Sequence, residues 1–357
     1  MTGTLSASSL LQRPESPASP PLLDPGAGFD VRRHPGFTVL ADLLSEDPRA
    51  FAHSVAQGLS DHPRWLHCRW LYDRRGSAIF ERITEQPEYY PTRTEATLLA
   101  EIVPGLIGEI LPDDIVEIGA GSSEKTRLIL DAATSRGRVI RYVPLDVDRL
   151  TLEATAARLT RDYPGLSVHA VVGDFERDLA HVPPPTGRRL ALFLGSTIGN
   201  LDAPERRQLL AGLRALLPDR GDRLLLGVDL VKDVKVLEAA YRDSAGVTRD
   251  FNRNILRVIN HAVDGDFEPE AFRHHAFYNE RASRIEMHLV ADTAQTVKLG
   301  RLGLTVRFRP GDGIWTENSY KFTRDGVEAM LASASLDLAQ WHVDPANYFA
   351  LALAAPR

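Results

Sequence analysis

Apolar residues in the middle of the chain fall into five short runs that are separated by amphipathic segments. The runs are rich in Val, Ile and Leu and span residues 114–120, 139–147, 166–174, 189–196 and 222–230. Near-continuous apolar strands that alternate with helices are typical of a parallel sheet covered on both faces. The pattern therefore predicts an α/β protein with an open, doubly wound, Rossmann-like sheet.

The segments that flank this sheet follow another pattern. Residues 37–61 and 76–91 show the helical spacing of apolar residues. Thr92, with Glu95 three positions later, resembles a capping box before a third helix. After Leu230 the regular alternation stops, and strand-like runs return with a different spacing.

These changes predict three regions. Residues 1–35 are rich in Pro, Ser and Gly, so we expect a disordered tail to which no function is assigned. Residues 36–93 plus 231–321 are expected to form a smaller, substrate-binding α+β lobe. Residues 94–230 plus 322–357 are expected to form the main domain with the parallel sheet.

Composition narrows the function classes. The 357 residues are 43% hydrophobic and 25% charged, and the formal net charge of −6 offers no basic field for nucleic acid. No apolar run is long enough to span a bilayer, and Cys68 is the single cysteine. We expect a cytoplasmic protein with a small-molecule substrate and neither nucleic acid nor membrane as a partner. The oligomeric state is left open, with a monomer as the working expectation.

A glycine turn follows the first predicted strand, in the stretch "IVEIGAGSSEKT" at 115–126. A nucleoside triphosphate loop needs a second glycine where Glu124 stands, directly before Lys125. The dinucleotide fingerprint needs its third glycine at the same position, and an acidic residue there disfavours a pyrophosphate. Both of these cofactor classes therefore fit poorly.

Carboxylates at the ends of the next two strands indicate another nucleoside. Glu117 precedes the turn, and Asp146 ends the second strand, where it can accept hydrogen bonds from ribose hydroxyls. Asp174 and Phe175 end the third strand, where a carboxylate and a ring can hold adenine. Asp146 or Asp174 could instead cap the following helix. Together these features favour S-adenosylmethionine, with its amino-carboxylate end near the turn and Lys125.

Several longer motifs resemble the histidine Nα-methyltransferases, enzymes that form hercynine in ergothioneine biosynthesis with S-adenosylmethionine as methyl donor. The motifs are "PEYYPTRTE", "GAGSSEKT", "PLDVD", "GDFE", "FLGSTIGN", "GVDLVKD", "AGVTRDFNRN" and "TENSYKF". The resemblance implies a class I methyltransferase sheet and a cofactor site of Gly119, Lys125, Asp146, Asp174 and Phe175. It also implies a substrate site of Tyr72, Tyr89, Asn200, Tyr241, Glu317 and Ser319.

These residue types suit L-histidine as the substrate. Asn200 can bridge the ammonium and carboxylate ends, and Tyr241 can donate to the carboxylate. Glu317 and Ser319, two apart on a strand, face the same side and can contact the two imidazole nitrogens. Taken alone, Asn200 could be a turn residue and Glu317 an exposed strand carboxylate.

The resemblance implies three successive methyl transfers to the α-amino group, with Tyr72 as the candidate to accept or relay the proton. No histidine has the spacing of a metal ligand, so no metal is expected. Glu286 and His288 are interpreted as structural, with Met287 on the opposite strand face. Two alternative functions stay open. One is methylation of another amino acid such as tryptophan, and the other is a non-catalytic S-adenosylmethionine-binding module.

Overall fold

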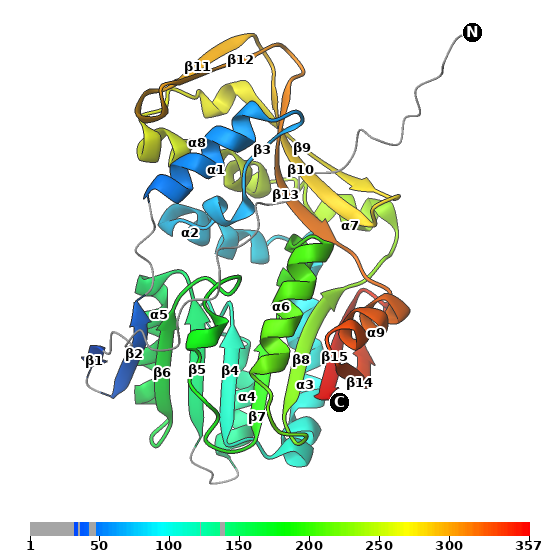
Figure 1. The fold of residues 1–357 in the computed structure, drawn as a ribbon. Helices are drawn as coiled ribbons and strands as arrows, with labels where there is room; N and C mark the ends of the chain where they lie inside the picture. The colour runs from blue at the N-terminus through cyan, green and yellow to red at the C-terminus, as the bar shows by residue number, and fades with distance from the viewer. Residues whose placement is uncertain (1–31, 35, 43–47, 122, 136–139) are drawn as a thin grey trace.

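The computed structural model describes residues 32–34, 36–42, 48–121, 123–135 and 140–357. The predicted tail therefore lies outside the described residues, except for a short strand at residues 32–34. The chain folds into two stacked parts, a main domain around a large sheet and a smaller lobe above it (Figure 1).

The main domain contains a nine-stranded sheet in the order β1-β2-β6-β5-β4-β7-β8-β15-β14. The strands are β1 (Arg32–His34), β2 (Phe37–Asp42), β4 (Asp114–Ile118), β5 (Arg141–Asp146), β6 (Ser167–Val172), β7 (Arg189–Phe193), β8 (Arg223–Asp229), β14 (Leu336–Val343) and β15 (Phe349–Pro356). Strands β2 to β8 of this sheet pair in parallel, and β15 joins β8 antiparallel. The predicted doubly wound sheet is confirmed, and the antiparallel direction of β15, next to the edge, was not predicted from the sequence.

Helices cover both faces of this sheet because its strands are apolar on both sides. All five residues of β4 and all five of β7 are buried. The helices α3 (Tyr90–Ile110), α4 (Thr126–Thr134) and α5 (Arg149–Asp162) pack on one face. The helices α6 (Ala203–Ala215) and α9 (Arg324–Ser333) pack on the other. The carboxyl ends of the parallel strands stay open and face the smaller lobe (Figure 1).

The smaller lobe is built on a four-stranded sheet in the order β3-β13-β10-β9. Its strands are β3 (Arg64–Trp65), β9 (Phe272–Asn279), β10 (Arg284–Ala291) and β13 (Gly313–Tyr320), with a separate hairpin of β11 (Gln295–Leu299) and β12 (Leu304–Phe308). Its helices are α1 (Pro48–Ser60), α2 (Arg74–Thr84), α7 (Val234–Ala240) and α8 (Val247–Val263). One hydrophobic core joins residues from 51–90 to residues from 237–314, far apart in sequence.

Two local expectations were wrong. Residues 37–42 are a strand that pairs with β6 in the large sheet, not the start of a helix in the smaller lobe. Helical spacing misled there because Val39, Leu40 and Ala41 are consecutive apolar residues, so the strand shows no strict alternation. Helix α3 begins at Tyr90, without a side-chain cap, so Glu95 lies inside the helix and forms no capping box. The buried carboxylate of Glu95 has another role, described below.

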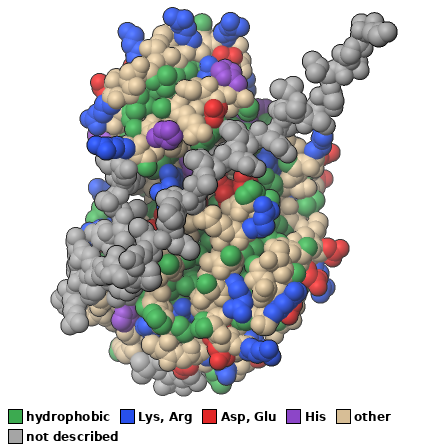
Figure 2. Space-filling model, viewed as in Figure 1, with side chains coloured by type: hydrophobic (Ala, Val, Ile, Leu, Met, Phe, Trp, Pro, Cys, Tyr) green, Lys and Arg blue, Asp and Glu red, His purple; other side chains and the backbone are tan. Residues whose placement is uncertain are grey.

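Charged side chains of both signs are interspersed over the face of the molecule seen in Figure 2. None of the helices in the described part of the chain is long and apolar enough to cross a membrane.

Candidate active site

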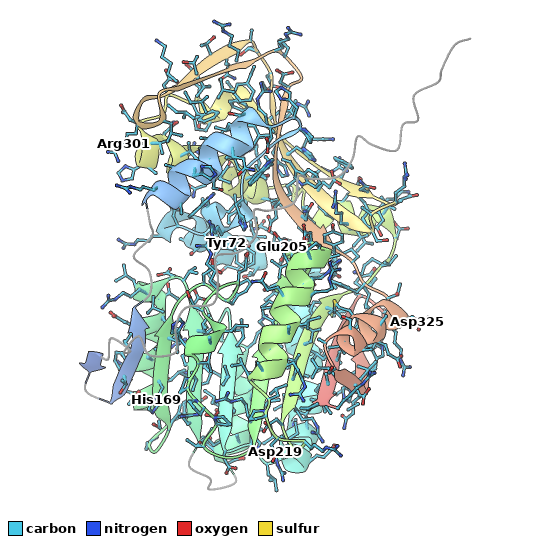
Figure 3. The ribbon with its side chains drawn as sticks, viewed as in Figure 1. Tyr72, His169, Glu205, Asp219, Arg301 and Asp325 are labelled. Carbon is cyan, nitrogen blue, oxygen red and sulfur yellow. The ribbon has the colours of Figure 1, made fainter. Side chains whose placement is uncertain are left out.

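A cavity lies where the smaller lobe meets the carboxyl ends of β7 and β8. All substrate-side residues that the sequence indicated line this cavity, namely Tyr72, Tyr89, Asn200, Tyr241, Glu317 and Ser319. They come from five separate segments of the chain. The label of Tyr72 in Figure 3 marks this junction between the lobes.

Aromatic rings form one wall of the cavity. The ring centroid of Tyr72 lies 5.3 Å from that of Phe251 and 5.7 Å from that of Phe80, both edge to face. Tyr89 and Tyr241 make a similar contact at 6.3 Å. Burial raises the pKa of Tyr72 and of Tyr89 well above 10, so both stay neutral phenols at physiological pH.

The opposite wall is strand β13, whose alternation brings Glu317 and Ser319 to the cavity side. Lys321 follows at the same spacing and is fully buried. Its ammonium donates to the Ser319 hydroxyl at 2.8 Å and to the Tyr241 hydroxyl at 3.0 Å. Tyr241 in turn donates to Ser319 at 2.7 Å. Lys321 was not singled out from the sequence.

Glu317 is the unusual member of this wall. It is buried, and among the described residues no donor forms a hydrogen bond to its carboxyl group. Burial raises its pKa to about 8, although the charge of Lys321 acts in the opposite direction. A buried carboxyl group without a partner indicates a binding role, because such groups are normally satisfied within the fold.

A buried ion cluster supports this wall from below. The Asp229 carboxylate, at the end of β8, pairs with Lys321 at 2.8 Å and also with Lys232. Tyr90 donates to both oxygens of Asp229 at 2.8 Å. Desolvation lowers the pKa of Lys232 to about 8, while the two ammonium groups hold the pKa of Asp229 below its usual value despite burial. This cluster was not predicted from the sequence, because its members lie on three distant segments.

A tight loop brings Asn200 to the cavity. It runs from the end of β7 into the short 3-10 helix η4 (Thr197–Asn200), and Ser196 has a left-handed φ of +56°. The Ser196 hydroxyl accepts from the backbone N–H of Asp229 at 2.9 Å. A Cβ on Gly199 would lie 2.9 Å from the Tyr320 carbonyl oxygen, so glycine lets the loop pack directly on β13.

The predicted cofactor residues lie along the carboxyl ends of the neighbouring strands β4, β5 and β6. Gly119 and Gly121 have φ values of +70° and +49°, and a Cβ on either would meet open space. Asp146 accepts from the backbone N–H of Gly121 at 2.8 Å and of Asp148 at 2.9 Å. Each oxygen keeps a free lone pair, so ribose hydroxyls fit this carboxylate. Glu117 lies below the turn, buried against Thr126 at 2.5 Å.

The carboxyl ends of β4, β5 and β6, here called the cofactor edge, are connected to the cavity by Lys125 and Glu95. The Lys125 ammonium pairs with the buried Glu95 carboxylate. Glu95 also accepts from the backbone N–H of Gly195 at 2.7 Å, and Gly195 lines the substrate cavity. Lys125 is therefore held at the junction of the two sites, with its charge already partly compensated by Glu95.

The smaller lobe reaches the carboxyl end of β6 through Arg69. The Arg69 guanidinium lies 3.3 Å from an Asp174 oxygen and stacks on Trp70, 4.2 Å from the ring centroid. Phe175 packs edge to face on Phe193 at 5.5 Å. The sequence did not indicate that a residue of the other lobe contacts Asp174.

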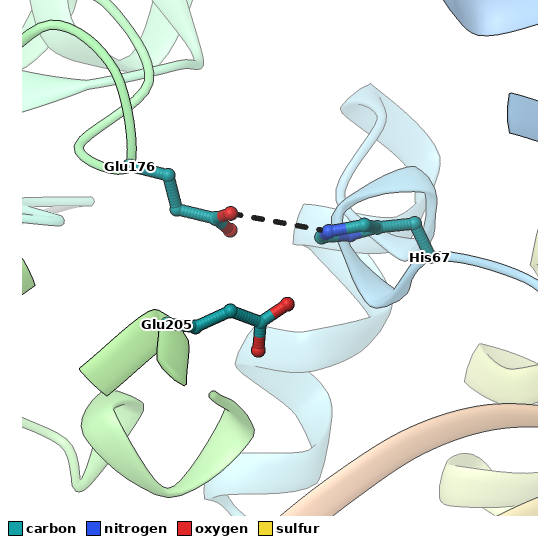
Figure 4. Close-up of side chains that lie close together, drawn as sticks. All are labelled: His67, Glu176 and Glu205. Carbon is teal, nitrogen blue, oxygen red and sulfur yellow. Dashed lines mark ion pairs between the residues drawn. The ribbon is translucent and has the colours of Figure 1, made fainter. Parts of the chain in front are cut away.

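Three further groups converge beside this contact, namely His67, Glu176 and Glu205 (Figure 4). Nε2 of His67 lies 4.0 Å from Glu176, whose pKa is raised to about 8 by burial and then by the charges of Asp174 and Glu205. Nδ1 of His67 accepts from the backbone N–H of Arg69 at 3.3 Å, so the ring proton lies on Nε2. Metal-binding histidines need that nitrogen free, so this cluster suits a shared proton better than a cation.

Met287 also belongs to the cavity, although the sequence singled it out only as the residue facing away from Glu286. It pairs directly with Glu317 across β10 and β13 and lines the cavity. Glu286 and His288 lie on the other face, where hydrogen bonds with His288, Arg284 and Asn279 outweigh burial and keep the pKa of Glu286 at about 2. The signal that could have found Met287 was this alternation of strand faces.

The comparisons with known proteins give a consistent family. Residues 51–356 match the model of the histidine-specific, S-adenosylmethionine-dependent methyltransferases. The chain is 47% identical to a histidine N-alpha-methyltransferase of Mycobacterium tuberculosis over 88% of this chain and 98% of the relative. It is 31% identical to ergothioneine biosynthesis protein 1 of Neurospora crassa, over 79% of this chain and 32% of the relative. It is also 28% identical to an L-tryptophan methyltransferase of Psilocybe serbica, over 85% and 92%.

Proposed function

The chain belongs to the histidine-specific, S-adenosylmethionine-dependent methyltransferases, and from this premise we propose that it trimethylates the α-amino group of L-histidine to give hercynine. The observation that carries the proposal is the Glu317 carboxyl group, buried in the cavity without a partner and beside the Ser319 hydroxyl. An imidazole ring supplies the N–H that such a group needs, and an aliphatic side chain does not.

S-adenosylmethionine is the methyl donor. We propose that Gly119, Asp146, Asp174 and Phe175 hold its nucleoside, and that Lys125 pairs with its carboxylate. The open space beside the two positive-φ glycines and the free lone pairs of Asp146 support this placement. Lys125 would share its charge between that carboxylate and Glu95.

In each transfer the amine lone pair attacks the sulfonium methyl carbon, and the carbon–sulfur bond breaks with its electrons moving to sulfur. One proton must leave the nitrogen before each attack. We propose that placement beside the aromatic wall supplies most of the acceleration. Tyr72 is a neutral phenol in this environment, so it can pass the proton on by accepting and donating hydrogen bonds but not as a phenolate base.

At the other end of the substrate, we propose that Asn200 and Tyr241 contact the carboxylate. Tyr89 and Tyr72 offer ring faces to the growing methylammonium group, a contact worth about 0.5–2 kcal/mol. We also propose that no metal takes part, which the tautomer of His67 supports. A cytoplasmic setting is proposed because the sequence contains a single cysteine, so no disulfide can form within it.

The test is incubation of the protein with L-histidine and S-adenosylmethionine, followed by mass spectrometry of the products. Trimethylated histidine is the expected product, and an arrest at one methyl group would contradict successive transfer. L-tryptophan in place of histidine is the matched comparison, because a relative methylates tryptophan. A faster reaction with tryptophan would overturn the assignment of histidine. Binding of cofactor without any methylated product would instead favour a non-catalytic binding module.

A further inference from the structure

We infer that Lys321 is a positioning residue that fixes the Ser319 hydroxyl as a hydrogen-bond donor to a substrate ring nitrogen carrying a lone pair. The inference deepens the proposed function and rests on it, because it concerns how the same cavity recognises the substrate ring by hydrogen bonds. It goes beyond the presence of Ser319 and Glu317 by assigning a direction to each hydrogen bond.

The Lys321 ammonium has three acceptors within hydrogen-bond distance. They are the Asp229 carboxylate at 2.8 Å, the Ser319 hydroxyl at 2.8 Å and the Tyr241 hydroxyl at 3.0 Å. An ammonium group donates and cannot accept. The Lys321 side chain is fully buried, so it is held among these three groups and not in bulk solvent.

The Ser319 oxygen therefore receives two hydrogen bonds within the protein, one from Lys321 and one from Tyr241 at 2.7 Å. A hydroxyl group has two lone pairs and one hydrogen. With both lone pairs occupied, its hydrogen is left for the cavity. If a substrate carboxylate draws the Tyr241 hydrogen away, Lys321 still donates to Ser319, and its positive charge opposes the approach of another N–H.

Glu317 supplies the hydrogen-bond acceptor that complements the Ser319 donor. It lies two residues before Ser319 on the same strand face and, once ionised, can only accept. One donor and one acceptor side by side match a neutral imidazole, which has one N–H and one bare nitrogen. An imidazolium would bring an N–H against Ser319 and Lys321, and an indole offers no ring acceptor at all. The pair therefore selects the neutral ring in one orientation.

Lys232 provides a matched control within the same ion cluster. It is also buried and pairs with the same Asp229 carboxylate, but its other hydrogen bonds go to Tyr90 and the Leu230 carbonyl, not to Ser319. Replacing either lysine by methionine leaves Asp229 with one ammonium partner. The two variants thus each remove one buried amine that contacts Asp229, and they differ in the contact with Ser319.

The experiment uses ring analogues of histidine. β-(4-Thiazolyl)-L-alanine and β-(5-thiazolyl)-L-alanine each keep one bare ring nitrogen, at the two positions that the imidazole nitrogens occupy. β-(3-Thienyl)-L-alanine and β-(2-thienyl)-L-alanine replace that nitrogen by CH. Dissociation constants are measured calorimetrically with S-adenosylhomocysteine present, at pH 9, where Glu317 is mostly ionised and cannot donate. A thienyl-to-thiazolyl ratio of dissociation constants above one then indicates that the protein donates a hydrogen bond to the ring nitrogen.

We expect one thiazolyl isomer to bind about tenfold more tightly than its thienyl counterpart in the natural protein. Lys321→Met should reduce that ratio to about twofold or less, whereas Lys321→Arg should retain most of it. Lys232→Met should leave it near tenfold. Ser319→Ala should abolish it, and this variant keeps the test decisive even if Lys321→Met does not fold.

A ratio that persists in Lys321→Met or in Ser319→Ala overturns the inference, as does an equal loss in Lys232→Met. Failure of the proposed function has a separate signature. In that case the natural protein binds or methylates no L-histidine at all, whatever the analogue ratios. Histidine methylation with an unchanged ratio in the lysine variants would leave the proposed function standing and remove only the role of Lys321.

Discussion

The cofactor edge and the substrate cavity of this molecule are built in different ways. At the edge, Asp146 accepts two backbone N–H groups from its own strand end and from the neighbouring turn. In the cavity, Glu317 has no hydrogen-bond partner among the described residues and an elevated pKa. The acid at the edge has its protein partners in place, whereas the acid in the cavity has none among the described residues, and we propose that the ligand supplies one.

The support of the two regions differs as well. Backbone groups of adjacent loops hold the cofactor edge, so its geometry follows from the parallel sheet itself. The cavity wall depends on Asp229, Lys232 and Lys321, charged residues buried together between the two lobes. Buried ion clusters are sensitive to the loss of one member, because the remaining charges are left uncompensated. The cavity should therefore be the more fragile of the two regions.

Asp229→Asn should have the largest effect, because it leaves Lys232 and Lys321 buried without their shared carboxylate. We expect the free energy of unfolding to fall by about 3–5 kcal/mol in urea denaturation at pH 6. The loss should be smaller at pH 9, since the pKa of Lys232 is about 8 and this lysine can then release its proton. Lys232→Met keeps one ion pair and should lose less. Unchanged stability of Asp229→Asn at pH 6 would contradict the dependence of the cavity on this cluster.

Asp146→Asn should act on the cofactor edge alone. The asparagine keeps an acceptor for Gly121 but loses the charge and one acceptor offered to ribose, so S-adenosylhomocysteine should bind about 10- to 100-fold more weakly. Histidine binding without cofactor should change by less than about threefold. Asp148→Asn, on the same loop, removes a charge but keeps a side-chain oxygen to cap α5, and serves as the control. Isothermal titration of all three proteins checks this, and equal weakening by both variants would refute a specific role for Asp146.

The difference between the cofactor edge and the substrate cavity also explains which features could be predicted from the sequence. The five apolar strands, the glycine turn and the acids that end β5 and β6 are local patterns, and they were sufficient for the large sheet and its edge. Glu317 and Ser319 were found through a family resemblance carried by one motif. Lys321, Asp229 and Arg69 were missed because their meaning depends on partners that are distant in sequence. Glu95 was misassigned to a cap for the same reason.

Glu317→Gln should stabilise the free protein while weakening histidine binding. The pKa of Glu317 is about 8 in the fold against 4.5 for the ordinary side chain, so the folded state holds a proton that the unfolded state releases between these values. The stability of the natural protein therefore falls as pH rises through this window, and the penalty is complete above pH 8. Glutamine carries no such penalty.

The expected gain of Glu317→Gln is absent near pH 4 and about 1–2 kcal/mol at pH 9, below the full value of the shift because a buried amide also lacks partners. Urea denaturation at pH 4, 7 and 9 measures it. Glu286→Gln is the contrasting control: the pKa of this half-buried carboxylate is lowered to about 2 by its hydrogen bonds, so its loss should destabilise at neutral pH. A Glu317→Gln gain that does not grow with pH would show that the carboxyl group is satisfied in the fold.

Arg69→Met should have the smallest effect, because it breaks a contact between the two regions and not a site within either. The Arg69–Asp174 pair is partly exposed, with 3.3 Å between its closest atoms, so about 1 kcal/mol or less is expected, or a loss of up to about fivefold in cofactor affinity.

The more informative measurement on Arg69→Met is the coupling between cofactor binding and histidine binding. If the pair joins the lobes when adenine is bound, S-adenosylhomocysteine should tighten histidine binding less in Arg69→Met than in the natural protein, and histidine should tighten cofactor binding less by the same factor. Arg177→Met, an exposed arginine on the same loop as Asp174, should leave that factor unchanged. Equal coupling in all three proteins would mean that the cofactor edge and the substrate cavity communicate through Lys125 and Glu95 instead, the other link between them.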